Sequence, residues 1–283
     1  MAINNFIPHI WSANLLSTLK KAQVFANYAN RDYQGDITDS GGSVTISQIG
    51  DITIFDYVPN VTTITPQELQ DAASILFIDQ KKGYAFKIDD VDAAQSKPKV
   101  MTEAMDKAAY SLSDTQDIYI AGLYASAGLS QNTNASPVDM TSLNVDDQFL
   151  ACGETMDVAG ISRQGRFAII APWVLTKLVL AGIASLSENV ATFTNGYIGR
   201  AYGFDFSISP NVSKNSLSWD KTRNLLGSAK SSITVAEQIV KTESYRQTSE
   251  GFGDVVKGLH VYGAKIIRPD MTLVLYASKT AEA

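Results

Sequence analysis

The stretch NGYIGRAYGFDFSISPNV, residues 195–212, contains the residue types from which phosphate-binding loops are built. A dinucleotide-binding loop has the spacing G-x-G-x-x-G between a strand and a helix, because backbone amides must converge on the pyrophosphate at the helix N-terminus. Here Gly196, Gly199 and Gly203 follow the spacing G-x-x-G-x-x-x-G, and the alternating residues after them are typical of a strand. The stretch therefore predicts tight turns before a strand and no phosphate site.

Asp89, Asp90 and Asp92 form a group of carboxylates of the kind that hard cations bind. The glycine and the terminal glutamate of an EF-hand loop do not follow them. Because acidic residues also interact favourably with a helix N-terminus, we interpret the group as the approach to a helix. The sequence predicts neither a metal nor another cofactor.

Cys152 is the only cysteine, and His9 and His260 are the only histidines. A cysteine nucleophile needs a base beside it, and neither histidine is near Cys152 in sequence, although folding can bring distant residues together. We interpret Cys152 as a small buried apolar side chain and the histidines as structural or surface residues. No pair of carboxylates is spaced for acid/base catalysis, so the sequence predicts a protein that is not an enzyme.

The net charge of −6 argues against a nucleic-acid reader with a basic surface. The charge is also unevenly distributed, because 32–80 holds eight acidic residues and no lysine or arginine. The rest of the chain has a small basic excess. No apolar run is continuous enough to cross a membrane, and the first residues lack the pattern of a secretory signal, so synthesis in the cytoplasm is expected.

Helical periodicity is clearest after Pro98, where it predicts one helix from Met101 to Ala127 that ends at Gly128. At a rise of 1.5 Å per residue this helix would be roughly 40 Å long. Shorter helices are expected at 11–29, from Thr65-Pro66 onward, at 145–158, from Pro172 to Gly182, and at 233–240.

Strands are expected where β-branched and polar residues alternate. In 35–65 this alternation flanks Gly41-Gly42 and Gly50-Asp51, which predicts a hairpin with glycine turns. Two strands alone are marginally stable in water, so this hairpin needs a surface to lie on. Further strands are expected at ILFID, YAFKI, RFAIIAP and FDFSISP and on both sides of Pro269. The irregular order of helices and strands predicts an α+β fold.

Seven stretches in chain order resemble the major capsid (coat) proteins of tailed bacteriophages, and the likeness covers nearly the whole chain. They are IWSANLLSTLKKAQVFANYANRDYQG, the extended hairpin, DQKKGYAFKIDDVDAAQ, the long helix, GRFAIIAPWV, GYIGRAYGFDFSISPNV and GLHVYGAKIIRPDMTLVLYAS. The resemblance implies the α+β capsid fold that tailed phages share with herpesviruses. It also implies a virion protein that assembles into hexamers and pentamers of an icosahedral head enclosing double-stranded DNA.

The same resemblance implies a division of the chain into parts. These are an N-terminal arm (1–34), an extended loop (35–66), a peripheral domain (67–127) with a spine helix, an axial domain (128–250), a return strand of the peripheral domain (251–266) and the end of the axial domain (267–283).

The partners implied by the resemblance are further copies of the chain, a scaffolding protein, a portal protein and packaged DNA contacted without sequence specificity. Some family members join neighbours through an isopeptide bond between a lysine on the extended loop and an asparagine in the peripheral domain. Here the loop has no lysine, and Gly251 stands where that asparagine would align, so no cross-link is expected. No long segment precedes the arm, so the scaffolding protein is expected to be a separate chain.

We predict that the acidic loop of one subunit lies on a more basic surface of the next subunit. The residues expected at this contact are Asp36, Asp39, Asp51, Phe55, Asp56, Tyr57, Trp11, Lys20 and Lys21. Three alternatives stay open at this point: an encapsulin-type nanocompartment shell, a β-rich binding or adhesion module, and a nucleotide-dependent enzyme.

Overall fold

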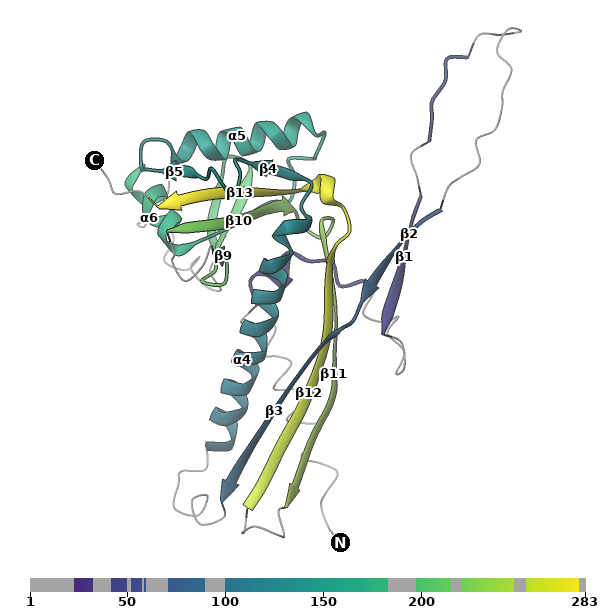
Figure 1. Cartoon of the computed structure of the whole chain (residues 1–283), viewed down its shortest axis with the longest axis vertical. Helices are drawn as coiled ribbons and strands as arrows, with labels where there is room; N and C mark the ends of the chain where they lie inside the picture. Colours follow the sequence, from purple (N-terminus) through teal and green to yellow (C-terminus); the bar gives the residue numbers. More distant parts are fainter. Residues whose placement is uncertain are drawn as a thin grey trace.

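The structure is a computed structural model that describes residues 23–32, 42–49, 52–57, 59, 71–89, 100–182, 197–214, 220–246 and 253–279. Figure 1 shows three parts: a body of helices packed with a sheet, a long helix beside a narrow sheet, and a protruding pair of strands. The architecture is α+β, as the order of elements predicted.

The body contains an eight-stranded sheet with the order β4-β13-β10-β6-β8-β7, in which β5 also pairs with β13 and β9 with β10. Its strands are β4 (Leu129–Gln131), β5 (Val138–Met140), β6 (Arg166–Ile170), β7 (Tyr197–Ala201), β8 (Phe204–Ile208), β9 (Ser213–Lys214), β10 (Lys221–Ser228) and β13 (Thr272–Lys279). The last strand, β13, lies antiparallel to β10 and parallel to β4 and β5. Strand β13 therefore connects the short strands β4 and β5 to β10 and the rest of the sheet.

Helices α5 (Val145–Val158) and α6 (Pro172–Leu180) share one core with this sheet. All five residues of β6 are buried, and α5 contributes Phe149, Cys152 and Met156. The rings of Phe149 and Phe206 meet edge to face with centroids 5.0 Å apart. The predicted helices at 145–158 and after Pro172 are confirmed.

The long helix α4 (Val100–Gly122) continues into a 3-10 turn, η2 (Leu123–Ser126), and confirms the predicted long helix. It lies beside a sheet of order β11-β12-β3, formed by β11 (Ile233–Arg246), β12 (Gly253–Ile266) and β3 (Gln80–Asp89). Met105 and Leu112 of α4 pack against Val256, Tyr84 and Phe86 of the sheet. This helix therefore covers one face of the three-stranded sheet (Figure 1).

The helix predicted at 233–240 is wrong, because this segment belongs to strand β11, which pairs with β12 from Ile233 to Arg246. Ile233 and Val235 enter the main core, whereas Ala236 joins a second cluster at the base of β1 and β2. Two apolar environments on opposite sides favour a strand, since successive side chains of a strand point to opposite faces. Long-range pairing thus overrides the weak helical pattern.

The predicted hairpin within 35–65 is also wrong in its pairing. Strand β1 (Ser43–Ile49) lies antiparallel to β2 (Asp71–Phe77), with Ser43 opposite Phe77, and 52–57 belongs to no strand. The register buries Val44, Ile46 and Leu76 on the face that meets Ala236. A shift by one residue would expose this apolar face, so burial determines the pairing. The helix predicted after Thr65 lies outside the described residues.

The glycine-rich stretch forms a tight turn before strand β8, as predicted, and also a bulge that was not predicted. Tyr202 (φ 51°) and Gly203 (φ 83°) form the two-residue turn between β7 and β8, and two positive φ values suit the right-handed twist of a hairpin. Gly199 (φ 146°) lies where the register shifts. Residues 197–201 also form a strand, β7, which was not predicted. Of the helix predicted at 11–29, only α2 (Phe25–Tyr28) falls in the described part.

Candidate assembly surfaces

Segment 52–57 presents large side chains that its own subunit leaves exposed. Ile54 is 94% exposed, and Ile52, Phe55 and Tyr57 are each more than half exposed. We call these four residues the loop surface. Because a cluster of large exposed apolar side chains on a folded chain typically marks a contact site, the loop surface is a candidate interface.

The structure locates only part of the predicted contact site. Phe55, Asp56 and Tyr57 lie together in 52–57 and are exposed, as a contact site requires. The other residues named for this contact lie outside the described residues: Trp11, Lys20, Lys21, Asp36, Asp39 and Asp51.

The three-stranded sheet presents a second exposed surface on the side opposite α4. Residues that alternate with the helix-facing ones carry its exposed side chains, and we call this set the sheet surface: Lys81, Lys87, Tyr245, Lys257 and Leu259. The Lys257 ammonium group lies 2.9 Å from Glu243 and 5.5 Å from the ring centroid of Tyr245. Among the described side chains on this face, three lysines accompany one glutamate, so the sheet surface is basic and partly apolar.

The sheet surface was not predicted from the sequence, although a signal for it was present. Lys81 and Lys87 are six residues apart in one strand, which puts them on the same face of a sheet. Lys257 could not be added from sequence, because only the register of β12 with β3 brings it beside them.

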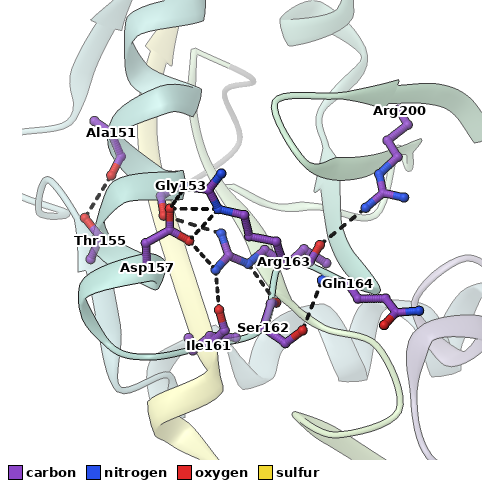
Figure 2. Close-up of polar contacts among 10 residues, drawn as sticks. Ala151, Gly153, Thr155, Asp157, Ile161, Ser162, Arg163, Gln164 and Arg200 are labelled. Atoms are coloured by element: carbon purple, nitrogen blue, oxygen red, sulfur yellow. Dashed lines mark hydrogen bonds and ion pairs between the residues drawn. The ribbon is translucent and has the colours of Figure 1, made fainter.

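A charged cluster at the end of α5 links this helix to the turn that leads into β6 (Figure 2). Asp157 Oδ2 lies 2.5 Å from Arg163 Nη2, and its Oδ1 lies 2.7 Å from Arg166 Nη2. Arg166 is buried and also donates to the carbonyl oxygens of Ser162 and Ile161. The two guanidinium groups lower the pKa of Asp157 to about 2.

An open cleft of about 660 Å³ borders this cluster, lined by Leu150, Tyr202 and Gly203 among others. The Asp157 carboxylate beside it already accepts hydrogen bonds from both arginines. A carboxylate held ionised in this way is a poor general base. We therefore interpret the cluster as structural.

A buried polar network joins three separate segments of the chain. Glu237 of β11 accepts hydrogen bonds from Arg31 and from Gln116 Nε2 of α4, the latter at 2.9 Å. Asp117 Oδ2 accepts a 2.9 Å hydrogen bond from the backbone N–H of Val24. His260 of β12 is 1% exposed, with Nε2 3.9 Å from Glu237 Oε2. The network thus ties residues 23–32 to α4 and to the three-stranded sheet.

Burial shifts the pKa values of two groups in this network in opposite senses. It raises the pKa of Asp117 to about 7, against the lowering effect of backbone hydrogen bonds. It lowers the pKa of His260, and the charge of Glu237 offsets part of that effect. From the sequence, His260 was expected to be a structural or surface residue, and this network was not predicted. The polar pair Gln116-Asp117 inside a long helix was the available signal.

The described residues show no arrangement that suggests catalysis. Cys152 is fully buried, and burial raises the pKa of its thiol to about 12, which disfavours the nucleophilic thiolate. No three His, Cys, Asp or Glu side chains of the described part are grouped as metal ligands. None of its helices has the length and apolar character that a membrane span requires.

Comparison with known proteins gives consistent matches. The model of the phage capsid protein family matches residues 74–274 of the 283. A solved structure titled Mycobacterium phage Che8 is 25% identical, with a TM-score of 0.69 over 89% of this chain and 90% of that one. The capsid of cyanophage P-SCSP1u is 19% identical, with a TM-score of 0.70 over 92% and 89%. The comparison with curated proteins gives no match.

A virus-like particle from Pyrococcus furiosus has the same fold, with 12% identity and a TM-score of 0.59 over 95% of this chain and 99% of that one. At such low identity the likeness concerns the fold alone. The family match covers more than half of the sequence, and the chain belongs to the phage capsid protein family. It is a major capsid protein, a non-enzymatic structural component of the icosahedral head of a tailed phage.

Proposed function

We propose that neighbouring subunits of the shell are joined by the loop surface of one copy lying on the sheet surface of the next. The observation that carries this proposal is the exposure of Ile52, Ile54, Phe55 and Tyr57 on a segment that protrudes from its own subunit (Figure 1). Their burial on a neighbour would provide the hydrophobic contribution that the isolated subunit lacks.

The two surfaces are complementary in composition. The loop surface is apolar and lies in the lysine-free segment 32–80, which contributes Asp56 next to Phe55 and Tyr57. The sheet surface offers the apolar parts of Tyr245 and Leu259 beside three lysines. Each exposed ion pair contributes only about 0–1 kcal/mol, so charge selects the partner and apolar burial supplies most of the affinity.

Because the two surfaces differ, the contact is heterologous and closes into rings, as hexamers and pentamers require. The family resemblance supports two further partners, a separate scaffolding protein and a portal protein. The lysine-free loop supports a shell without lysine–asparagine cross-links, held by non-covalent contacts. The acidic net charge of −6 supports only weak, non-specific contact with the packaged DNA.

A charge exchange between the two surfaces tests the contact. Reversing the loop charges with Asp51→Lys and Asp56→Lys should prevent shell formation, because the loop would meet the lysines with like charge. Reversing the sheet charges with Lys81→Glu and Lys87→Glu should do the same. Combining all four changes should restore closed shells, measured by electron microscopy and sedimentation.

The control is Lys107→Glu on the exposed side of α4, which makes the same kind of charge reversal at a single lysine away from the sheet surface. This variant should assemble normally, and circular dichroism should show that every variant is folded. Raising the salt concentration should weaken wild-type assembly, because exposed ion pairs are screened. Normal shells from either double variant, or no recovery in the fourfold variant, would refute the contact.

A further inference from the structure

The carboxylate of Glu237 is shared by three segments that lie far apart in the sequence. Arg31, which follows α2, donates to Oε1, and Gln116 of α4 donates to Oε2. His260 of β12 brings Nε2 to 3.9 Å from Oε2. Glu237 is only 7% exposed, so these contacts are formed away from water. The carboxylate is the point at which residues 23–32 are held against α4 and the sheet.

His260 is the member of this cluster whose hydrogen bonding is incomplete. Neither ring nitrogen has a hydrogen-bond partner among the described residues, although the side chain is 1% exposed. A neutral imidazole can remain in such a place, but a charged one requires a partner. Among the described residues, Glu237 is the only carboxylate within ion-pair distance of His260, and Arg31 already pairs with it.

The other charged and titratable groups around His260 come from every element packed against it. Lys82 of β3 lies opposite His260 in the register, and the Tyr262 ring lies 5.1 Å from the imidazole. The remaining groups of this region are Tyr119 and Asp117 of α4 and Asp79 between β2 and β3. Lys82 and Arg31 oppose a further positive charge, and Glu237 favours it.

We propose that this cluster is a proton-controlled latch that holds residues 23–32 on α4 and releases them when His260 takes up a proton. The latch goes beyond the shell contact described above and stands on the folded subunit alone. A charged His260 competes with Arg31 for the carboxylate of Glu237. Arg31 is the only cation by which 23–32 reaches this site in the described part.

The direction of the pH effect follows from the burial of His260. Burial lowers the pKa of His260 in the closed latch below its ordinary value of 6.5. When 23–32 separates, Arg31 leaves the Glu237 carboxylate, which can then pair with a charged His260, and the pKa of His260 rises toward 6.5. The closed form therefore binds fewer protons than the open one, so its stability is complete above about pH 6.5 and declines as the pH falls. Between the two pKa values, each pH unit shifts the equilibrium toward opening by about tenfold.

Asp117 contributes in the opposite sense and has to be separated in the experiment. Its pKa is raised to about 7 in the closed form, so the closed form gains a proton on Asp117 as the pH falls. Protonation of Asp117 therefore stabilises the closed form and offsets part of the destabilisation that protonation of His260 causes. Comparing two proteins that both retain Asp117 removes its contribution from the result.

Hydrogen exchange of the full-length, unassembled subunit tests the latch from about pH 5 to 8. The informative amides are those of Val24, Asn30 and Val235, which bond to Asp117, Ile233 and Asn30 respectively. Exchange is measured in the wild type and in His260→Gln and corrected for intrinsic rates. The protection of these amides in the wild type, relative to the variant, should fall by about tenfold per pH unit below 6.5.

His9→Gln is the matched control, since it makes the same substitution at the other histidine, and it should retain the wild-type pH dependence. A wild-type-to-variant ratio that stays constant across the range overturns the latch. An NMR titration of the His260 ring in the wild type, assigned with His9→Gln, gives a second test. A midpoint below 6.5 accompanied by loss of protection at the three amides supports the latch. A midpoint at or above 6.5, or protection that survives protonation, refutes it.

Discussion

The core of the eight-stranded sheet buries large apolar side chains, whereas the loop surface leaves side chains of the same kind exposed. Phe167 and all of β6 are buried within the subunit, and the Phe167 ring stacks on Tyr28 at 4.6 Å. Phe55 and Ile54 are as apolar but remain exposed. The first region is stabilised by burial within its own chain, whereas the second leaves its apolar side chains exposed on the subunit. Stability of the subunit and assembly of the shell should therefore respond to different mutations.

The largest effect is expected from one substitution made in both regions. Phe167→Ala removes a fully buried ring and should lower the free energy of unfolding by about 3–5 kcal/mol, because it loses apolar burial and leaves a cavity. Phe55→Ala should change that free energy by less than about 0.5 kcal/mol, since the ring is half exposed in the subunit. Urea denaturation of unassembled subunits measures both.

Shell formation should give the reverse order when the surviving subunits are compared at equal folded concentration. Phe55→Ala should assemble poorly although it is as stable as the wild type. Similar stability losses for the two variants would show that the loop surface already belongs to the subunit core, and the comparison would fail.

A smaller effect is expected at Gly263, where β12 passes close to the end of β2. A methyl group at this position would lie 2.1 Å from the carbonyl oxygen of Phe77. Gly263→Ala should therefore displace the strand pair β1–β2 and cost about 1–3 kcal/mol. Relative to the wild type, the variant should show a larger increase in hydrogen-exchange rate in β1 and β2 than in β6. Gly122→Ala, where a methyl meets open space, is the matched control and should leave stability unchanged or slightly raised.

The smallest effect is expected at the Asp157 cluster, and it should appear as a change in pH dependence. The pKa of Asp157 is lowered to about 2 from 3.8, so its contribution to stability is present above about pH 4 and is lost as the pH falls toward 2. Asp157→Asn should lower the melting temperature at neutral pH and match the wild type near pH 2. Glu154→Gln, which removes an exposed carboxylate of the same helix, is the matched control for the loss of one negative charge. A constant difference for Asp157→Asn would contradict the role of its charge.

Elements whose pattern is local were predicted well from the sequence. The long helix, α5 and the start of α6 at Pro172 follow from helical periodicity and capping. The turn at Gly203 follows from glycine chemistry, and the break at Pro269 between β12 and β13 follows from proline. The errors fell on β11 and on the partner of β1, where pairing over a long sequence distance decides the outcome.

The candidate site divides in the same way. The lysine-free segment and its exposed Phe55, Asp56 and Tyr57 could be named from composition alone. The sheet surface could not, because Lys87 and Lys257 come close together only through the register of β3 with β12. The latch could not be predicted from the sequence for the same reason, because its residues come from four separate parts of the chain: Arg31, Gln116, Glu237 and His260.

By itself, the sequence determined the class of fold, the positions of the main helices and the segregation of acidic charge into one segment. These depend on residue type and on spacing within a few turns of chain. Only the tertiary structure decided which strands pair, which face of the narrow sheet α4 leaves exposed, and which polar groups meet in the interior. Those outcomes depend on burial shared between distant segments, and apolar burial is non-directional, so no local pattern specifies the partner.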